Sequence, residues 1–281
     1  MIGVIGGSGF ESFADFVTVR ELDRKTPFGL TSSGFKVVSV EGKEFAFLSR
    51  HGAHHEALPS EVNYRANIYA MKALGVQAVV SFSAVGSLAK EYKPGDLVVS
   101  SQYIDRTKGV RGHTFLGEGI VGHVSLAKPI CEKMSQRLQE LSKNFSFDRH
   151  FNLTQVVIEG PYFSTKAESL TYRQMGAQII GMTNFPEFAL AREAGLPYLP
   201  CGFVTDYDCW DDSIPHVTVD EVIRVMKQNN SKAFEILQSI LKAGPIWEGS
   251  LAPAGGLKSG LFMPRERIPA DKKQWMDVLL S

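Results

Sequence analysis

Short runs of apolar and β-branched residues recur along this chain with segments of helical periodicity between them, and this alternation limits its possible folds more than any other feature. The runs predict strands over residues 2–5, 35–40, 45–48, 76–82, 97–101, 155–158, 178–180 and 198–204. Apolar residues at helical spacing predict helices over residues 62–74, 126–141, 185–194 and 219–241. Such alternation predicts an α/β fold with a largely parallel central β-sheet flanked by helices.

The domain organisation follows from where this pattern stops. A length of 281 residues allows one large α/β domain or two small ones. No repeat or low-complexity linker precedes residue 243, so we expect a single domain over residues 1–242. Residues 244–260 are rich in Gly, Pro and Ala. We expect residues 243–281 to form an extension that packs on the domain or on a neighbouring subunit, or else an arm with little order.

Charge and cysteine content exclude several classes of protein. The formal net charge is +0 and no basic run occurs, which argues against nucleic acid or an anionic membrane as the main partner. Cys131, Cys201 and Cys209 are widely spaced and form no C-x-x-C pair, which argues against a disulfide framework or a thiolate metal site. The first strand begins at once, without a basic leader, and no apolar run reaches the ~20 residues that span a bilayer. We therefore expect a cytoplasmic protein.

A glycine-rich turn, Gly6-Gly7-Ser8-Gly9, follows the first expected strand. Such a turn can point consecutive N–H groups, together with the Ser8 hydroxyl, at a phosphate. A tight turn without a ligand has the same sequence. The dinucleotide-binding fingerprint fails because Ser12 stands at its third glycine, and a nucleophile elbow fails because Phe10 stands at its last glycine.

Arginine and three histidines follow the strand that ends near residue 48, in the segment 50–56. The His55-Glu56 pair begins an H-E-x-x-H zinc motif, but Pro59 occupies the position of its second histidine and would break the helix. No metal is expected here. Arg50 as a forked donor to a phosphate dianion, with a hydrogen bond from His51, is the better functional interpretation, and a solvated polar loop is the alternative.

Small hydroxylic residues end a third strand, in the segment 81–87 that contains Ser83 and Ala84. Ligands of open parallel sheets collect beyond the carboxyl ends of the strands. Three separate strands thus end in residues that suit phosphate, which indicates one site rather than three unrelated turns.

Two later strand ends carry residues that suit a nucleoside. Phe163 could stack on a flat base, although an ordinary core position explains it equally well. Met182 could pack under a sugar, and Thr183 could donate to phosphate, although a single methionine is usually in the core.

Two carboxylates, Asp206 and Asp208, follow the strand over residues 198–204. If strand geometry continues, they point to the same side. Such a pair suits a divalent cation or acid–base chemistry, and a helix cap next to a solvated neighbour is the alternative without a ligand.

Taken together in order, the motifs resemble the 5′-methylthioadenosine phosphorylase branch of the trimeric purine nucleoside phosphorylases. The resemblance covers about residues 1–242. The matching motifs are Gly6-Gly7-Ser8-Gly9, Thr26-Pro27-Phe28-Gly29, Arg50-His51-Gly52, Val62-Asn63-Tyr64, Gly86-Ser87-Leu88, Pro94-Gly95-Asp96, Glu159-Gly160-Pro161, Ala167-Glu168-Ser169, Gly181-Met182-Thr183, Pro186-Glu187 and Thr205-Asp206-Tyr207-Asp208-Cys209-Trp210.

This resemblance implies one α/β domain with a mixed sheet, assembled as a homotrimer. It implies site roles residue by residue. Phosphate would be held by Ser8, Arg50, His51, Ser83 or Ala84, and Thr183. Met182 would lie against the ribose and Phe163 near the base, with Asp206 on adenine N7 and Asp208 on the 6-amino group. His123 would reach a neighbouring subunit's 5′ pocket, and Val219 would receive the 5′-thiomethyl group.

The resemblance also implies the reaction and its specificity. Relatives that take 6-oxopurines typically carry an acid where Ser164 stands and an asparagine where Asp206 stands. An amino group donates protons and requires an acceptor, and a mispaired buried group costs ~1–3 kcal/mol. Phosphorolysis of 5′-methylthioadenosine, without metal or organic cofactor, is the expectation. Alternatives are a phosphorylase that prefers adenosine, inosine or 5′-methylthioinosine, a nucleoside hydrolase, or a nucleotide-binding module without activity.

Overall fold

The computed structural model describes residues 1–10, 16–213, 219–248 and 256–281, with residues 219–221 described by their backbone only. Its described part contains a mixed sheet in the order β10-β9-β8-β11-β7-β1-β6-β5-β2, and β10 also pairs with β7. The strands of this sheet are β1 (Ile2–Gly6), β2 (Val17–Leu22), β5 (Phe35–Val40), β6 (Lys43–Ser49), β7 (Ala78–Ser87), β8 (Leu97–Arg106), β9 (Arg149–Ile158), β10 (Ile179–Gly181) and β11 (Tyr198–Asp206). A small separate hairpin joins β3 (Lys25–Thr26) to β4 (Gly29–Leu30).

The centre of the sheet is parallel. Strand β1 pairs in parallel with β6 and β7, β7 pairs in parallel with β11, and β9 pairs in parallel with β8 and β10. The pairings of β11 with β8, β10 with β7, β5 with β6 and β2 with β5 are antiparallel. Because β10 returns to β7, the strands β7, β11, β8, β9 and β10 close on themselves, and several strand ends come together on one side.

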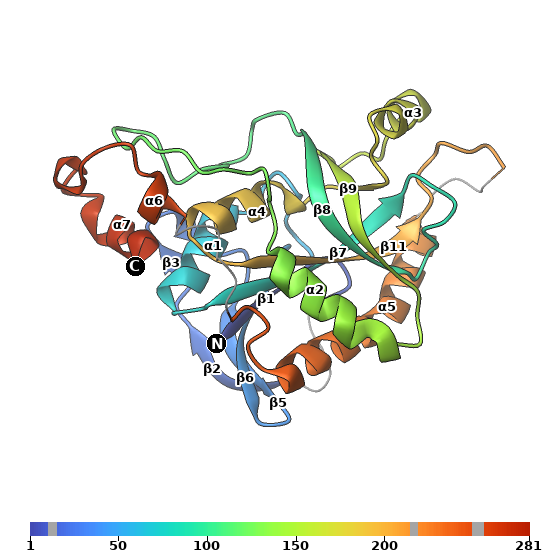
Figure 1. Ribbon diagram of the computed structural model, residues 1–281, viewed down its shortest axis with the longest axis horizontal. Helices are drawn as coiled ribbons and strands as arrows, with labels where there is room; N and C mark the ends of the chain where they lie inside the picture. Colours follow the sequence, from blue (N-terminus) through green and yellow to red (C-terminus); the bar gives the residue numbers. More distant parts are fainter. Residues whose placement is uncertain (11–15, 214–218, 249–255) are drawn as a thin grey trace.

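Helices cover both faces of the sheet (Figure 1). The core on one face includes buried residues of α1 (Tyr64–Ala73) and α4 (Asn184–Glu193), and the core on the other face includes residues of α2 (Glu132–Leu141) and α5 (Val219–Ala243). Neighbouring residues of β1 show the alternation: Ile5 belongs to the first core and Val4 to the second. The α/β fold expected from the sequence is confirmed.

The chain after residue 243 has structure of its own. It contains α6 (Leu257–Gly260) and α7 (Lys273–Leu280) within the described residues. Met276, Leu279 and Leu280 of α7 are buried in the same core as α1. In Figure 1 both helices lie beside α1, at the end of the molecule that also holds the C-terminus.

All eight expected strands are present, several of them longer than expected. The expected bounds of α1, α4 and α5 agree with the observed ones to within two residues. Helix α2, in contrast, begins at Glu132 instead of near residue 126. Strand β2 and helix α3 (Lys166–Gln174) were not predicted from the sequence. Both lack a clear apolar stripe: β2 is an edge strand with exposed side chains, and only Ser169 and Tyr172 of α3 are buried.

Candidate active site

A cavity of about 710 Å³ lies where strand ends meet helix α5, and this volume falls in the range of small-molecule sites, about 300–1,000 Å³. Loops after β1, β6, β9, β10 and β11 and the end of β7 contribute to its wall. The sequence-predicted residues that line it are Ser8, Arg50, His51, Ser83, Ala84, Phe163, Ser164, Met182, Thr183, Asp206 and Asp208. The expected constellation of strand ends is therefore one site.

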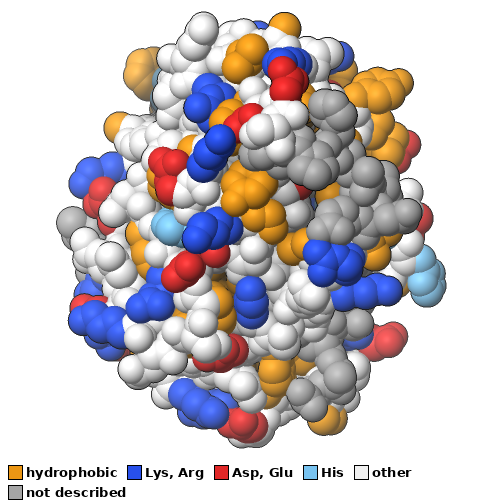
Figure 2. All heavy atoms as spheres, turned by 90° about the vertical axis from the view of Figure 1, so that its right-hand side faces the viewer, with side chains coloured by type: hydrophobic (Ala, Val, Ile, Leu, Met, Phe, Trp, Pro, Cys, Tyr) orange, Lys and Arg blue, Asp and Glu red, His pale blue; other side chains and the backbone are white. Residues whose placement is uncertain are grey.

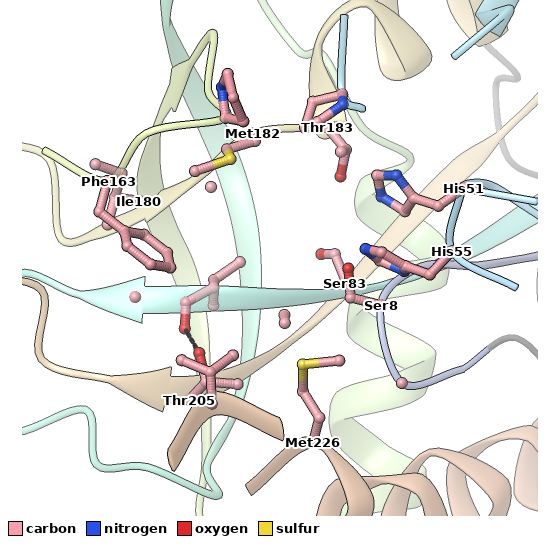
Figure 3. A pocket seen from close by; sticks show the side chains of 18 of the residues that line it. Ser8, His51, His55, Ser83, Phe163, Ile180, Met182, Thr183, Thr205 and Met226 are labelled. Atoms are coloured by element: carbon pink, nitrogen blue, oxygen red, sulfur yellow. Dashed lines mark hydrogen bonds between the residues drawn. The ribbon is translucent and has the colours of Figure 1, made fainter. Parts of the chain in front are cut away.

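Hydroxyl groups gather at one end of the cavity. In Figure 3, Ser8 and Ser83 lie next to each other, and Thr183 faces them across the opening. The Ser83 hydroxyl is buried without a hydrogen-bond partner among the described residues. Thr183 precedes helix α4, and its side chain makes no capping hydrogen bond. A buried hydroxyl without a partner is costly, so this end of the cavity is suited to a polar ligand.

Close backbone approach explains the glycine at position 7. A Cβ there would lie 2.3 Å from Nη1 of Arg50 and 2.6 Å from the carbonyl oxygen of Phe82. The backbone N–H of Gly7 donates to this same carbonyl at 3.0 Å. The glycine-rich turn thus packs directly on Arg50, next to the Ser8 and Ser83 hydroxyls.

Arg50 lines the cavity, but its forked face is directed away from it. The side chain is 0% exposed, Nε donates to Glu187 Oε2 at 2.7 Å, and Nη2 donates to Glu187 Oε1 at 2.9 Å. Nη1 donates to the carbonyl oxygen of Phe82 at 3.1 Å. Forked donation to phosphate, as the sequence analysis expected, is therefore not the geometry here, because a buried carboxylate occupies the fork. Nη1, next to Gly7, has a second N–H besides the one that donates to Phe82, and this is the part of the guanidinium that can donate to a ligand.

The charge of Arg50 is maintained by the same carboxylate. Burial disfavours the cation, but the charge of Glu187 and its hydrogen bonds outweigh burial and raise the pKa of Arg50 above its ordinary value. The pair is buried on both sides, with side-chain exposures of 0% and 1%. The ion pair thus brings almost no net charge to this end of the cavity.

Two histidines form part of the wall beside the hydroxyls. The rings of His51 and His55 stack with their centroids 4.6 Å apart (Figure 3). Nδ1 of His51 lies 2.8 Å from the carbonyl oxygen of Ala57, which can only accept, so the neutral ring carries its proton on Nδ1. Its Nε2 would then donate to a ligand only in the protonated ring. In the sequence, His55 stands out only as the start of an incomplete zinc motif, and no local pattern predicts that the loop returns its ring to His51.

The two aspartates line the cavity next to Thr205, whose hydroxyl donates to Asp206 Oδ2 at 2.7 Å and which Figure 3 shows away from Ser8 and Ser83, but strand geometry does not align them. Strand β11 ends at Asp206, with a register shift against β7 between Val204 and Asp206. Asp206 Oδ1 accepts the backbone N–H of Asp208 at 2.8 Å, and Asp208 has a left-handed φ of 51°. This turn, closed by the aspartate's own side chain, brings both carboxylates to the cavity. The expected continuation of the strand is wrong, although the expected pairing of the two groups is right.

Burial disfavours ionisation of both aspartates. It raises the pKa of Asp206, against the hydrogen bonds from the Thr205 hydroxyl and the Asp208 N–H. It raises the pKa of Asp208 to about 6, where the hydroxyls of Ser169 and Ser164 oppose the rise and the charge of Asp206 adds to it. Asp208 is thus poised to exchange a proton with a ligand near neutral pH, and Asp206 takes up a proton more readily than an exposed aspartate does.

Phe163, Ser164 and Met182 line the same cavity as these aspartates, and Figure 3 shows Phe163 and Met182 on the same side of it as Ile180. Phe163 is 49% exposed, so it is a cavity wall and not a core residue. Arg111 fixes the backbone that carries Met182: it donates through Nη1 to the carbonyl oxygens of Met182 at 2.6 Å and Phe185 at 2.7 Å. No motif in the sequence marks Arg111 as part of the site.

Helix α5 closes the cavity with an apolar face. Val222, Ile223 and Met226 line it, and Figure 3 shows the thioether of Met226 directed inward. In the sequence, these residues belong to the apolar stripe that predicts the helix over residues 219–241. Val219, expected in the 5′ pocket, begins this helix, but its side chain lies outside the described residues.

His123 does not line this cavity. It is exposed, its N–H donates to the carbonyl oxygen of Gly260 at 2.8 Å, and its ring lies 6.1 Å from that of Phe262. Its expected role toward a neighbouring subunit's 5′ pocket stays a prediction.

Other features of the surface are unremarkable. The face in Figure 2 carries basic and acidic side chains side by side, with hydrophobic ones between them. Within the described ranges, no three His, Cys, Asp or Glu side chains are grouped as metal ligands would be. None of the helices described there is long and apolar enough to cross a membrane.

Comparison with known proteins decides the family. A model of the phosphorylase superfamily matches residues 1–242. The S-methyl-5′-thioadenosine phosphorylase of Geobacter sulfurreducens is 42% identical over 281 residues, with 100% of this chain and 98% of the relative covered. This chain belongs to the phosphorylase superfamily, in its S-methyl-5′-thioadenosine phosphorylase family.

Solved structures of the family agree. A methylthioadenosine phosphorylase from an antarctic soil metagenomic library superposes with a TM-score of 0.89 at 41% identity, and the match covers 100% of this chain and 98% of that one. A variant of the adenosine/methylthioadenosine phosphorylase of Schistosoma mansoni, in complex with methylthioadenosine, superposes with a TM-score of 0.85 at 35% identity, covering 93% of this chain and 98% of the other. Because some of these matches cover the whole chain, they include residues 243–281, which the resemblance found in the sequence did not.

Proposed function

We propose that this protein cleaves 5′-methylthioadenosine with phosphate, giving adenine and 5-methylthioribose 1-phosphate. The observation that carries the proposal is one cavity with two chemically different ends. Hydroxyls and imidazoles surround one end, two carboxylates of raised pKa line the other, and an apolar helix face lies beside them. Each part matches one portion of these substrates: phosphate, purine and thioether.

The carboxylate end suits adenine. With a pKa of about 6, Asp208 is mostly ionised at pH 7 and is an acceptor for a 6-amino group. Asp206, whose pKa burial raises, would protonate or hydrogen-bond N7 as negative charge develops on the leaving purine. A 6-oxo group would place its acceptor oxygen against the Asp208 carboxylate, a mispairing that costs ~1–3 kcal/mol.

The hydroxyl end would hold the nucleophile. Ser8, Ser83, Thr183 and Nη1 of Arg50 are donors directed at, or bordering, the same region. Phosphate fixed there could attack C1′ as the glycosidic bond lengthens, and positioning of this kind supplies up to ~7–11 kcal/mol. The phosphate dianion would also stabilise the cationic sugar. The reaction needs no metal and no organic cofactor.

The apolar wall favours a thioether over a hydroxyl at the 5′ position. Burial of a methylthio group against Val222, Ile223 and Met226 stabilises its complex by roughly 25 cal/mol per Å². A 5′-hydroxyl there would lose its hydrogen bonds to water. The S. mansoni relative is named for adenosine as well as methylthioadenosine, so adenosine is the substrate to compare.

A homotrimer working in the cytosol completes the proposal. Exposed apolar side chains lie next to His123: Phe262 is 79% and Val121 51% exposed, and the Phe262 N–H donates to the Val121 carbonyl oxygen at 2.8 Å. Such a surface is suited to a subunit contact. Light scattering coupled to size-exclusion chromatography should give three times the 31.0 kDa chain mass.

The test is a cleavage assay with and without phosphate on 5′-methylthioadenosine, adenosine, inosine and 5′-methylthioinosine. We expect phosphate-dependent cleavage with the highest kcat/KM for 5′-methylthioadenosine. Equal rates without phosphate would indicate a hydrolase, and a preference for either 6-oxopurine nucleoside would contradict the role of Asp208.

A further inference from the structure

A buried network of polar side chains connects residues that lie next to the hydroxyl end of the cavity. It starts at Ser100 of β8, whose hydroxyl donates to Gln155 Oε1 of β9 at 2.8 Å. Gln155 Nε2 donates to Asn184 Oδ1 at 3.0 Å, and Asn184 Nδ2 donates to the Tyr198 hydroxyl at 3.2 Å. The Tyr198 hydroxyl donates to Glu187 Oε1 at 2.8 Å, which leads to Arg50.

Every side chain of this network is buried. Gln155, Asn184 and Glu187 are 1% exposed, and Ser100 is 2% exposed. Tyr198, also 2% exposed, has its pKa raised well above the ordinary value by burial, so it stays a neutral donor. Buried polar groups of this kind have fixed partners, since a broken bond leaves a group that water cannot reach.

The network reaches two separate parts of the hydroxyl end. On one side Glu187 holds the Arg50 guanidinium, with Ser81 of β7 bridging both: its hydroxyl donates to Glu187 Oε1 at 2.6 Å and accepts from Arg50 Nη2 at 2.6 Å. On the other side Gln155 and Asn184 fix the turn that carries Thr183. Gln155 Nε2 lies 2.4 Å from where a Cβ on Gly181 would be, so it supports this turn from below.

We propose that this network, with Tyr198 as its central link, positions Arg50 and Thr183 as one unit for the phosphate co-substrate. The proposal rests on the proposed phosphorolysis. None of Gln155, Asn184, Glu187 and Tyr198 lines the cavity, so each acts through the residues that do. Nη1 of Arg50 and the Thr183 hydroxyl come from different strand ends, and a side-chain link between them fixes the distance that a phosphate must span.

The test uses Tyr198→Phe, which removes one hydroxyl and with it the bridge between Asn184 and Glu187. Arg50, Thr183 and the rest of the cavity wall are left unaltered. Asn184→Ala breaks the bridge from the other side. The matched control is Tyr92→Phe, which removes the hydroxyl of another buried tyrosine. This hydroxyl accepts from Gln178 Nε2 at 2.7 Å in a part-buried hydrogen bond, and Tyr92 lies outside the cavity wall.

We expect Tyr198→Phe to raise the phosphate KM about tenfold and to weaken the thermal shift produced by inorganic phosphate alone. The nucleoside KM should stay within about twofold, and Tyr92→Phe should change neither. Because both variants break the same bridge, the double variant Asn184→Ala/Tyr198→Phe should be no worse for phosphate than Asn184→Ala alone.

Tyr198→Phe and Asn184→Ala variants that lose thermal stability like Tyr92→Phe but keep the wild-type phosphate KM would overturn the proposal. Additive effects in the double variant would overturn it too. If the unaltered protein cleaves its nucleoside without phosphate, the proposed function fails, and this inference fails with it.

Discussion

Asp208→Asn should stabilise the ligand-free protein while damaging its chemistry. Burial raises the pKa of Asp208 from 3.8 to about 6, so the folded state holds this proton more tightly than the unfolded state does. The protonated Asp208 side chain therefore contributes fully to the free energy of unfolding below about pH 3.8, and this contribution is lost as the pH rises through about 6. At pH 8 the ionised side chain costs about 3 kcal/mol relative to its protonated form, at about 1.4 kcal/mol per unit.

Asparagine keeps the shape of the side chain and removes the charge. At pH 8 the variant should gain up to about 3 kcal/mol, or about 6 °C in Tm for a chain of this size. This gain should vanish near pH 4. Melting of both proteins at fixed concentration and scan rate, at pH 4, 6 and 8, measures it. Asp211→Asn is the control, and its effect on stability at pH 8 should have the opposite sign. Hydrogen bonds from Lys90 and Ser213 lower the pKa of Asp211, so its ionised form is the favoured one in the folded state.

The same variant should lose activity where it gains stability. Without a carboxylate acceptor, kcat/KM for 5′-methylthioadenosine should fall by roughly ten- to a hundredfold, the equivalent of ~1–3 kcal/mol, and the preference over 5′-methylthioinosine should narrow. In the unaltered protein, kcat/KM should fall as the pH drops below about 6, where Asp208 takes up its proton. A variant that is less stable at pH 8, or whose gain does not depend on pH, would refute the reasoning.

Three further predictions separate the parts of the cavity. Asp206→Asn should lower kcat about 10²–10⁴-fold without destabilising the protein at pH 8, because burial raises the pKa of Asp206 as well, and full activity would exclude a proton donor at N7. Ser83→Ala removes a buried hydroxyl that has no partner among the described residues, so the free energy of unfolding should stay the same or rise, by up to ~1–3 kcal/mol, while the phosphate KM rises about tenfold; an unchanged KM would place phosphate elsewhere. Met226→Gln should reduce the preference for 5′-methylthioadenosine over adenosine about tenfold, and a constant ratio of the two kcat/KM values would place the 5′ group away from α5.

The strand ends were predictable because apolar runs mark where each strand stops. The turn at Ser8, the segment at Arg50 and the segment at Asp206 each follow such a run, and parallel pairing brings them together. Helix α5 shows the limit of this reasoning. Met226 faces the cavity, whereas Ala233 and Ile236 of the same helix face the core. An apolar side chain that lines a cavity has the same periodicity as one that fills a core, so the sequence alone does not separate them.

The partner of Arg50 shows a second limit. The position of Arg50 beside the cavity could be predicted from the strand that precedes it. Its ion-pair partner Glu187 could not, because it lies 137 positions away in the sequence. The ion pair changes what the arginine can do. Its charge is already offset, so a phosphate dianion gains little from it by charge alone and depends on the neutral donors Ser8, Ser83 and Thr183. Neutral donors must be placed accurately to bind well, and the proposed buried network would meet this requirement at this end of the cavity.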